Sequence, residues 1–288
     1  MGLKVLVFGE VLWDLFPDGK YLGGAPLNFG AHLAQLGEDV RPVSAVGGDA
    51  LGTEALHKLE EMGLNREAIA VLKDMPTGRC IVTLDAEGSP QYDLWEQVAY
   101  DRIPCPKNFK DYDTLYFGTL ALRSQENLQT LRSLLNRRAI RQVFVDLNLR
   151  PPFVSQEAVD FALRAADFLK LSLEECPLTA QVLGWEYRGY ASLAQTLKEN
   201  YSNIKCILVT LGGEGAWGWE IPTGRQILCP GEKVCVRSTV GAGDSFCAGF
   251  LHRYEAGADF SECLKFGVSL SAYVVSQTEA IPSLPSLF

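Results

Sequence analysis

The chain has 288 residues, which is enough for one large domain or two small ones. Hydrophobic residues make up 47% and charged residues 21%, a composition that excludes disordered and fibrous proteins and supplies a sizeable apolar core. Lys and Arg number 26 against 35 Asp and Glu, so the net charge of −9 excludes a general affinity for nucleic acids or anionic membranes. An anionic ligand therefore needs a local site of positive potential.

Neither a signal peptide nor a membrane span is expected from the sequence. Glu10 and Asp14 interrupt the first apolar stretch too early for a signal peptide, and the uncharged stretch 266–278 is shorter than the ~20 residues of a spanning helix. The eight cysteines form no CxxC pair and the three histidines are far apart, which excludes zinc spacing and favours reduced thiols in the core. We expect a cytoplasmic protein.

Strands and helices alternate along most of the chain, which is typical of an α/β fold. The apolar run 3–8 predicts a strand buried on both faces, and Pro26 and Gly37 mark the two ends of the helix that follows. The further predicted elements are strands at 40–46, 114–117, 142–146, 168–171 and 206–211 and a helix at 50–62.

The region 71–100 has a different pattern, because it contains β-like segments without a helix between them. Residues 80–84 and 91–95 alternate as strands do, and the sequence AEGSP at 86–90 predicts the turn that joins them. We therefore predict a small β-sheet lid, formed by segments about 10–22 and 71–101, inserted in an α/β body. No repeat or linker divides the chain, so we predict a single domain over 1–288.

One motif in the sequence points to a function that its surroundings exclude. Residues 213–218 satisfy the dinucleotide pattern GxGxxG and follow a strand. The next residues, WEIP at 219–222, predict a strand and a turn where that fold requires a helix, and Trp217 is too bulky for close helix packing. The chain also lacks the pattern GxxxxGK[ST], which excludes a P-loop enzyme.

The run STVGAGDSF at 238–246 precedes an apolar helix. Two glycines around one alanine leave the backbone amides of residues 241–244 unshielded at a helix start, which carries about half a positive charge. This favours an anion, although a plain helix cap by Asp244 is the alternative. Phosphoryl transfer needs fixed dipoles and an aligned nucleophile together, so we predict that Asp244 deprotonates an alcohol beside the bound anion.

Near the other end of the chain, GGAPLN at 23–28 again places bare backbone at a helix start, with a loop and cap as the alternative reading. Asp14 follows the first strand, where open α/β sheets place ligand-binding groups. Its carboxylate and the Asn28 amide can bracket neighbouring sugar hydroxyls. Arg150, just past another strand, can contact a phosphate or sugar oxygen or hold its own loop in place.

Together these motifs resemble the ribokinase-like sugar kinases. The resemblance rests on GEVLWD at 9–14, GGAPLN at 23–28, DLNLRPPF at 146–153 and TVGAGDSF at 239–246, and it spans nearly the whole chain. GGAPxN with DxNLR is similar to the fructokinases in particular. The resemblance implies a three-layer α/β/α sandwich with a mainly parallel central sheet and a small inserted β-sheet lid.

The resemblance also implies roles for single residues. Asp244 would be the catalytic base, and the amides of Gly241, Ala242 and Gly243 would hold the moving phosphoryl group. The sugar would be bound by Asp14, Gly23, Gly24 and Asn28, with Arg150 as a further contact. The nucleotide would be bound by Ser172, Thr210, Gly212 and Gly213.

Some positions depart from the family pattern. Ser172 stands where the family has the Asn of an NxxE motif, in which Glu175 would act on Mg²⁺ through water; SxxE is also a capping box, so that alternative stays open. Ser238 and the segment 278–280 differ where relatives hold a monovalent cation, which leaves activation by K⁺ open. Val268 replaces an Asn near the adenine, so the base preference is open too.

These inferences predict an ATP-dependent sugar kinase with Mg²⁺ as cofactor. Its acceptor would be a primary hydroxyl of a ketose, with D-fructose converted to D-fructose 6-phosphate. The alternatives are a kinase of ribose, 2-keto-3-deoxygluconate or a nucleoside, and a non-catalytic sugar-sensing protein of the same fold. Unpaired strand edges in the lid would favour a homodimer.

Overall fold

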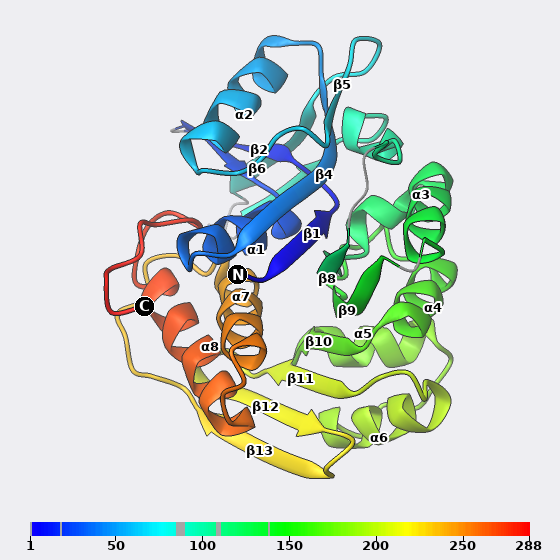
Figure 1. Ribbon diagram of the computed structural model, residues 1–288, viewed down its shortest axis with the longest axis vertical. Coiled ribbons are helices and arrows are strands. Elements are labelled where there is room, and N and C mark those ends of the chain that lie inside the picture. The colour runs from blue at the N-terminus through cyan, green and yellow to red at the C-terminus, as the bar shows by residue number, and fades with distance from the viewer. Residues whose placement is uncertain (1, 18, 85–89, 108–110, 138) are drawn as a thin grey trace.

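The computed structural model describes residues 2–17, 19–84, 90–107, 111–137 and 139–288 (Figure 1). Its strands form one sheet in the order β13-β12-β11-β10-β9-β8-β1-β4-β5 and a second sheet in the order β3-β2-β6-β7. Pairing is parallel from β11 to β5, and β12 and β13 are antiparallel. The predicted α/β class, with a mainly parallel large sheet and a small separate one, is confirmed.

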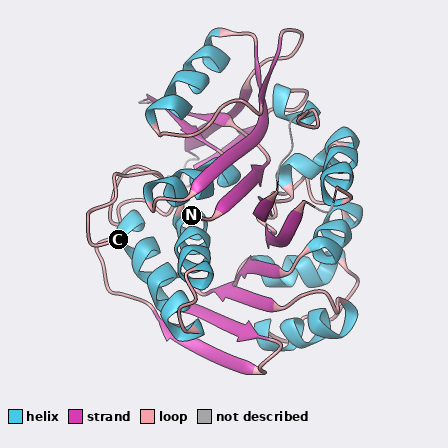
Figure 2. Ribbon diagram, in the orientation of Figure 1, coloured by secondary structure: helices cyan, strands magenta, loops and turns pink. Residues whose placement is uncertain are grey.

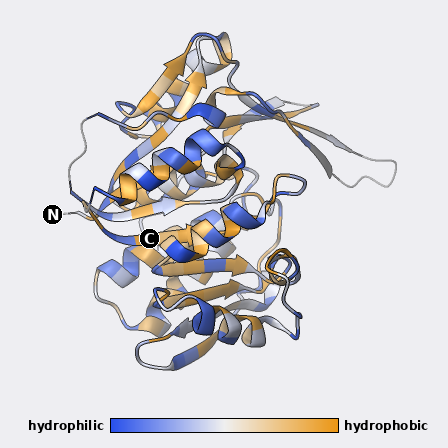
Figure 3. Cartoon of the chain, turned by 90° about the vertical axis from the view of Figure 1, so that its right-hand side faces the viewer, coloured by the Kyte–Doolittle hydropathy of each residue, from blue (hydrophilic) through white to orange (hydrophobic). Residues whose placement is uncertain are grey.

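The large sheet consists of β1 (Lys4–Phe8), β4 (Asp39–Gly47), β5 (Ile69–Leu72), β8 (Tyr112–Phe117), β9 (Ile140–Asp146), β10 (Phe168–Ser172), β11 (Cys206–Thr210), β12 (Gly215–Glu220) and β13 (Arg225–Pro230). The small sheet consists of β2 (Leu12–Phe16), β3 (Gly19–Gly23), β6 (Gly78–Leu84) and β7 (Pro90–Leu94). Figure 3 shows the small sheet extending from the body of the molecule.

Helices cover both faces of the large sheet (Figure 2). One face carries α1 (Ala25–Gln35), α2 (Ala50–Glu61), α7 (Ala242–Glu255) and α8 (Phe260–Val275). The other carries α3 (Gln125–Leu135), α4 (Gln156–Ala165), α5 (Glu175–Val182) and α6 (Tyr190–Asn200). Short 3₁₀ helices lie at Ala99–Arg102 (η1), Leu120–Arg123 (η2) and Gly212–Glu214 (η3).

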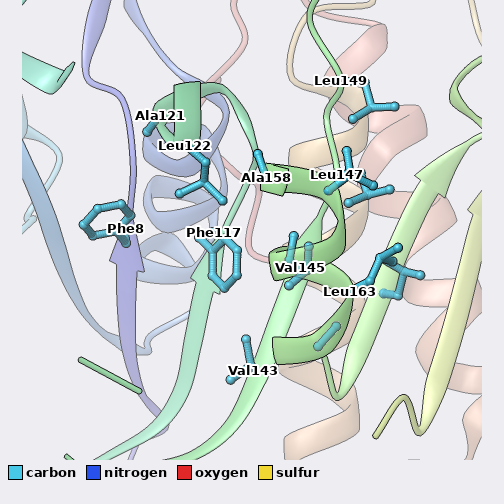
Figure 4. Close-up of a cluster of buried hydrophobic side chains, with 14 of the residues drawn as sticks. Phe8, Phe117, Ala121, Leu122, Val143, Val145, Leu147, Leu149, Ala158 and Leu163 are labelled. Atoms are coloured by element: carbon cyan, nitrogen blue, oxygen red, sulfur yellow. The ribbon is translucent and has the colours of Figure 1, made fainter. Parts of the chain in front are cut away.

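The alternation of side chains along the central strands explains why there are two cores. In β1, Leu6 and Phe8 point to the face covered by α3 to α6, while Val5 and Val7 point to the face covered by α1, α7 and α8. A strand apolar at every position is therefore buried on both sides, as the sequence run 3–8 predicts. Figure 4 shows part of the first core, in which Phe117 lies between Phe8 on one side and Val145 on the other.

The predicted strands and helices correspond to β1, α1, β4, α2, β8, β9, β10 and β11. The WEIP segment does lie in an antiparallel strand, β12, and its turn, which confirms that GxGxxG is not a dinucleotide motif here. One boundary differs: β5 pairs with β4 at the edge of the large sheet, so the second segment of the small sheet begins at Gly78 and not at Val71. Residues 86–89 of the predicted turn lie outside the described residues.

The chain order of the strands predicts a ligand site at one edge of the large sheet, the edge formed by the carboxyl ends of its parallel strands. From β1 the chain builds outward to β4 and β5, and then returns to add β8 on the other side of β1. Open α/β sheets bind ligands at such a reversal, outside the carboxyl ends of the strands. Among the described residues, no helix has both the length and the apolar character needed to cross a membrane.

Candidate active site

Two motifs that lie more than two hundred residues apart meet at the edge identified above. Helix α1 packs against helix α7 (Figure 1), and Asn28 and Asp244 both lie near the starts of these helices. The Asn28 Nδ2 atom donates a hydrogen bond to Asp244 Oδ2 at 2.8 Å, and both side chains are buried. The structure therefore brings the predicted sugar residue Asn28 into contact with the predicted base.

The GGAPLN loop is held by the chain just after β1. Gly24 has a φ of +118°, which is a conformation that favours glycine, and a Cβ there would lie 2.4 Å from the carbonyl oxygen of Glu10. The buried Glu10 carboxylate accepts a hydrogen bond from the Ala25 amide at 3.2 Å through Oε1. Glu10 and Gly24 together fix the start of α1, and with it the position of Asn28.

Asp14 lies on strand β2 of the small sheet and not in the turn directly after β1. A Cβ at Gly23 would lie 2.7 Å from Asp14 Oδ2, so the glycine makes room for this carboxylate. Burial raises the pKa of Asp14 to about 6, against the opposing effects of the Arg150 charge and a hydrogen bond from the Cys80 thiol. The small sheet thus contributes an acidic group of its own to the site.

Arg150 follows β9 and is exposed. Within the described part of the chain, no hydrogen bond or ion pair holds its guanidinium group. The alternative that it holds its own loop in place is therefore not supported. Its charge lowers the pKa values of Asp14 and Asp244, so this one cation acts on acidic groups of the small sheet and of helix α7.

Helix α7 begins at the glycine-rich segment for which the sequence predicts anion binding. Gly241 is the N-cap residue, with a φ of +81°, and no side chain caps the helix. Asp244 lies in the first turn, so the plain-cap alternative is wrong. The Ala242 amide reaches the Thr239 carbonyl at 3.3 Å, whereas the amides of Gly243 and Asp244 lie in the first turn, where a helix offers them no carbonyl partner.

A buried ion pair lies directly beneath this turn. Lys170 Nζ is 3.0 and 3.1 Å from the two carboxylate oxygens of Asp146, and a Cβ at Gly243 would lie 2.9 Å from the same ammonium group. Burial disfavours the charged ammonium, but the carboxylates of Asp146 and Glu175 outweigh it and raise the pKa of Lys170. The site therefore has a fixed positive charge under its backbone amides.

Asp244 has the acidity of a group that can exchange protons near neutral pH. Burial and the neighbouring Asp146 carboxylate raise its pKa to about 7, although Asn28, Lys170 and Arg150 act in the opposite direction. A general base is most effective when its pKa lies near the working pH. The environment of Asp244 fits that task.

Ser172 and Glu175 form a reciprocal capping arrangement at the end of β10. The Glu175 amide donates to Ser172 Oγ at 3.2 Å, and Glu175 Oε2 accepts from the Ser172 amide at 2.7 Å. Glu175 Oε1 accepts from the Leu149 amide at 2.6 Å. The capping alternative is therefore present in the structure, and each carboxylate oxygen keeps a lone pair for a water molecule.

The predicted nucleotide residues lie beyond Ser172 on the neighbouring strand. Ser172 and Thr210 are partners in the parallel pair of β10 and β11, and the Leu173 amide donates to the Thr210 carbonyl at 2.9 Å. Gly212 has a φ of +57°, and no described atom lies within 4 Å of a Cβ placed at Gly212 or Gly213. Gly212 and Gly213 therefore border open space.

The sequence argument missed Glu10, Asp146, Lys170 and Cys80 as parts of the site. A charged residue inside a strand that is otherwise apolar, such as Lys170 in FLKLS, is the signal that could have identified the buried pair. No sequence pattern links Cys80 to Asp14, because the pairing of β6 with β2 is visible only in the fold.

Comparison with known proteins identifies the family. The family model described as pfkB family carbohydrate kinase matches residues 8–287. The fructokinase of Vibrio alginolyticus is 26% identical, with 98% of this chain and 96% of the relative covered. The fructokinase of Vibrio cholerae O395, solved with fructose, ADP and calcium ion, superimposes with a TM-score of 0.84 at 24% identity, covering 98% of this chain and 96% of that one.

A second solved structure has the same fold and a different ligand. The aminoimidazole riboside kinase of Salmonella enterica, in complex with aminoimidazole riboside and an ATP analogue, has a TM-score of 0.82 at 22% identity. It covers 98% of this chain and 96% of its own. The family match extends over nearly the whole chain, and the chain therefore belongs to the pfkB family of carbohydrate kinases, which are phosphotransferases.

Proposed function

We propose that the protein transfers the γ-phosphoryl group of ATP to a primary hydroxyl of D-fructose, giving D-fructose 6-phosphate. The observation that carries the proposal is the hydrogen bond of 2.8 Å between Asn28 and Asp244, which joins the candidate sugar loop to the candidate base. The relatives named fructokinase support this choice of acceptor.

On the sugar side, the acceptor would lie between the small sheet and the starts of α1 and α7. The Asp14 carboxylate accepts hydrogen bonds from hydroxyl groups, and the Asn28 amide can donate and accept. Gly23 leaves room for the Asp14 carboxylate and Gly24 for the Glu10 carbonyl, and the exposed guanidinium of Arg150 would donate hydrogen bonds to the sugar oxygens.

On the phosphoryl side, one proton is transferred, one bond to phosphorus forms and one breaks. Asp244 accepts the proton of the sugar hydroxyl, the hydroxyl oxygen forms a bond to the γ-phosphorus, and the bond from that phosphorus to the bridging oxygen breaks to release ADP. The amides of residues 241–244 and the ammonium group of Lys170 stabilise the negative charge of the group in transit.

The donor set present fits Mg²⁺ held mostly by phosphate and water. Mg²⁺ retains several waters and uses one or two carboxylates, and Glu175 offers a lone pair on each oxygen after its two amide bonds. When bound, the ion would offset the negative charge of the phosphates, and Glu175 would hold it through water. Gly212 and Gly213 border open space, and with Thr210 at the end of β11 they would line the nucleotide site.

The small sheet would close over the bound sugar. Closure excludes water, which otherwise competes with the sugar as phosphoryl acceptor. The single-domain organisation and a homodimer through the edges of this sheet remain predictions; Tyr21, on the edge strand β3, is 48% exposed.

The proposed function is tested by ADP release with ATP and Mg²⁺ over a panel of fructose, ribose, 2-keto-3-deoxygluconate, glucose and adenosine, each with and without K⁺. A clear preference for fructose supports the proposal. Preference for another acceptor would show that the roles assigned to Asp14, Asn28 and the small sheet in selecting fructose are wrong. Sugar binding by calorimetry without turnover for any acceptor would show a sugar-sensing protein instead.

A further inference from the structure

Arg123 lies where the small sheet joins the body. It ends η2, which follows β8 of the large sheet, and only 8% of its side chain is exposed. Its Nη2 atom donates to the carbonyl oxygen of Trp95 at 2.6 Å, and Trp95 is the first residue after β7. One body side chain therefore holds the point where the last strand of the small sheet returns.

The same guanidinium group also fixes the next turn of the chain. Nε and Nη2 donate to the two carboxylate oxygens of Asp101 at 2.7 and 3.0 Å, which is a bidentate pair. Asp101 Oδ2 in turn accepts from the Val98 amide at 3.1 Å and closes the short helix η1. The segment between β7 and the body is thus ordered around one arginine.

Two aromatic rings complete the enclosure of Arg123. The guanidinium carbon lies 4.9 Å from the centre of the Tyr100 ring and 4.6 Å from that of Phe153, which follows β9. Tyr100 is fully buried, and a Cβ at Gly78 would lie 2.5 Å from its ring. Because Gly78 begins β6, the arginine also supports the other strand that leaves the body.

The charge of Arg123 also acts on the GGAPLN loop at 23–28, through Glu10. Its charge lowers the pKa of the buried Glu10 carboxyl group, although burial dominates and raises that pKa overall. Glu10 holds the Ala25 amide at the start of α1. The charge of Arg123 therefore acts on the group that positions Gly24 and Asn28.

We propose that Arg123 is a positioning residue that sets the orientation of the small sheet relative to the GGAPLN loop at 23–28, so that the sheet closes correctly over the acceptor. This inference rests on the proposed function. A bidentate, stacked site requires the planar guanidinium, and a lysine cannot replace it. Loss of Arg123 would leave the base and the nucleotide site intact but would weaken closure around the sugar.

The test compares Arg123→Lys and Arg123→Gln with Arg102→Gln. Arg102 is the matched control: it follows Asp101 directly, is 52% exposed, and its ion pairs with described residues are long, at 3.6 Å to Asp74 and 3.7 Å to Glu126. We expect both Arg123 variants to raise the sugar KM and the ratio of sugar-independent ATP hydrolysis to sugar phosphorylation about tenfold, since charged hydrogen bonds are lost. The ATP KM and all constants of Arg102→Gln should stay at wild-type values.

Asp101→Asn weakens the interaction between Arg123 and Asp101 from the other partner. It keeps the shape of Asp101 but removes the charge that Arg123 binds, so it should reproduce the Arg123 phenotype, and the double variant should be no worse than either single one. Wild-type sugar KM and hydrolysis ratio in the folded Arg123 variants would overturn the proposal. An equal rise of the sugar and ATP KM values would also overturn it, because that indicates general damage.

Hydrogen exchange distinguishes failure of this inference from failure of the proposed function. The amides of Trp95, Val98 and Ala99 bond to Arg79, Asp101 and Pro76. In Arg123→Gln these amides should exchange at least about tenfold faster than in wild type, whatever the protein phosphorylates. If wild type phosphorylates no sugar, the function has failed; if exchange is unchanged in the variant, the role of Arg123 has failed.

Discussion

The buried Asp244 and the partly buried Asp14 are carboxyl groups with different tasks, and their pKa values differ. The pKa of Asp244 is raised to about 7 and that of Asp14 to about 6, in both cases chiefly by burial. The base must be ionised to accept a proton, and we expect the sugar-binding carboxylate to be ionised as well. The acid limb of the pH profile should therefore contain both ionisations.

We predict that kcat/KM for the sugar falls about tenfold per pH unit below pH 7 and about a hundredfold per pH unit below pH 6. This constant reports the groups of the free enzyme. Asp14→Asn should remove the second ionisation and leave the first. Steady-state rates from pH 5 to 8.5 test this, and a profile that is flat down to pH 5 would rule out Asp244 as the base.

His32 is a buried histidine of α1 that bears on stability and not on catalysis. Its Nε2 atom lies 3.0 Å from the Ala280 carbonyl oxygen, and burial lowers its pKa to about 4. The unfolded chain therefore binds more protons than the folded one between about pH 6.5 and 4. Stability from this residue is present above that window and is lost as the pH falls through it.

We predict that the free energy of unfolding of His32→Gln, relative to wild type, improves by up to about 3 kcal/mol between pH 7.5 and pH 4.5. Urea unfolding of both proteins at the two pH values measures this difference. His57→Gln is the control, because the His57 side chain is 70% exposed. The same change at both pH values for His32→Gln would show that the imidazole takes up its proton without cost in the fold.

At the level of single residues, the sequence allowed us to predict candidate site residues where they belong to a recognisable motif. Gly24, Asn28 and Asp244 could be identified because their spacing has a chemical reason. Lys170 stands out as a charge in an apolar strand, but its role and that of Glu10 could not be predicted, since those roles depend on which strand end lies under which helix. The sequence also could not decide between capping and metal binding for Glu175, because the capping bonds leave its lone pairs free.

Helix α7 shows how an element places a reactive group. Its first residue follows Gly241, whose φ of +81° turns the chain so that the first amides face the site, and a Cβ there would lie 2.7 Å from the Ala280 carbonyl oxygen. Gly257, just after the other end of the helix, also has a positive φ, of +77°, but no described atom lies within 4 Å of a Cβ there. A side chain at Gly257 would therefore meet backbone strain alone, whereas one at Gly241 would meet both strain and a steric clash.

We predict that Gly241→Ala lowers kcat by up to about 10²-fold, because small displacements of aligned groups are costly in catalysis. Gly257→Ala should cost only the left-handed strain of about 1–2 kcal/mol in unfolding free energy and should keep the wild-type kcat. Chemical denaturation and steady-state assays on the two variants check both statements. Equal kcat values for the two would mean that the start of α7 does not place reacting groups.

Elements with strong periodicity were predictable, and the sheet edges were not. The central strands β1, β8, β9, β10 and β11 are apolar on both faces, which gives a clear signal in sequence. Strands β5 and β13 are edge strands with exposed positions, which weakens their signal in the sequence. No strand is predicted at either place, and the range 71–101 predicted for the lid includes the last two residues of β5.

On the scale of the whole molecule, the inserted sheet and the body divide the work of the proposed reaction. The body supplies Asp244, Lys170 and the nucleotide side, while the small sheet supplies Asp14 and the means of closure. The sequence predicted an inserted β region from its lack of helix signals. The parallel pairing of β2 with β6, which assembles that sheet from two distant segments, is a property of the fold.

We predict that ATP is hydrolysed in the absence of sugar at only a small fraction of the rate of sugar phosphorylation, because closure requires the acceptor. ADP release with and without fructose at saturating ATP measures both rates. Comparable rates would show that the small sheet does not exclude water.

The most direct test of the central claim compares wild type with Asp244→Asn at pH 8 and follows the appearance of D-fructose 6-phosphate. General-base catalysis typically supplies about 10² to 10⁴-fold, so we predict a loss of kcat in that range. The KM for fructose should change little, because Asn28 and Asp14 remain in place. A variant that keeps wild-type kcat would contradict the assignment of Asp244, and with it the mechanism proposed for this site.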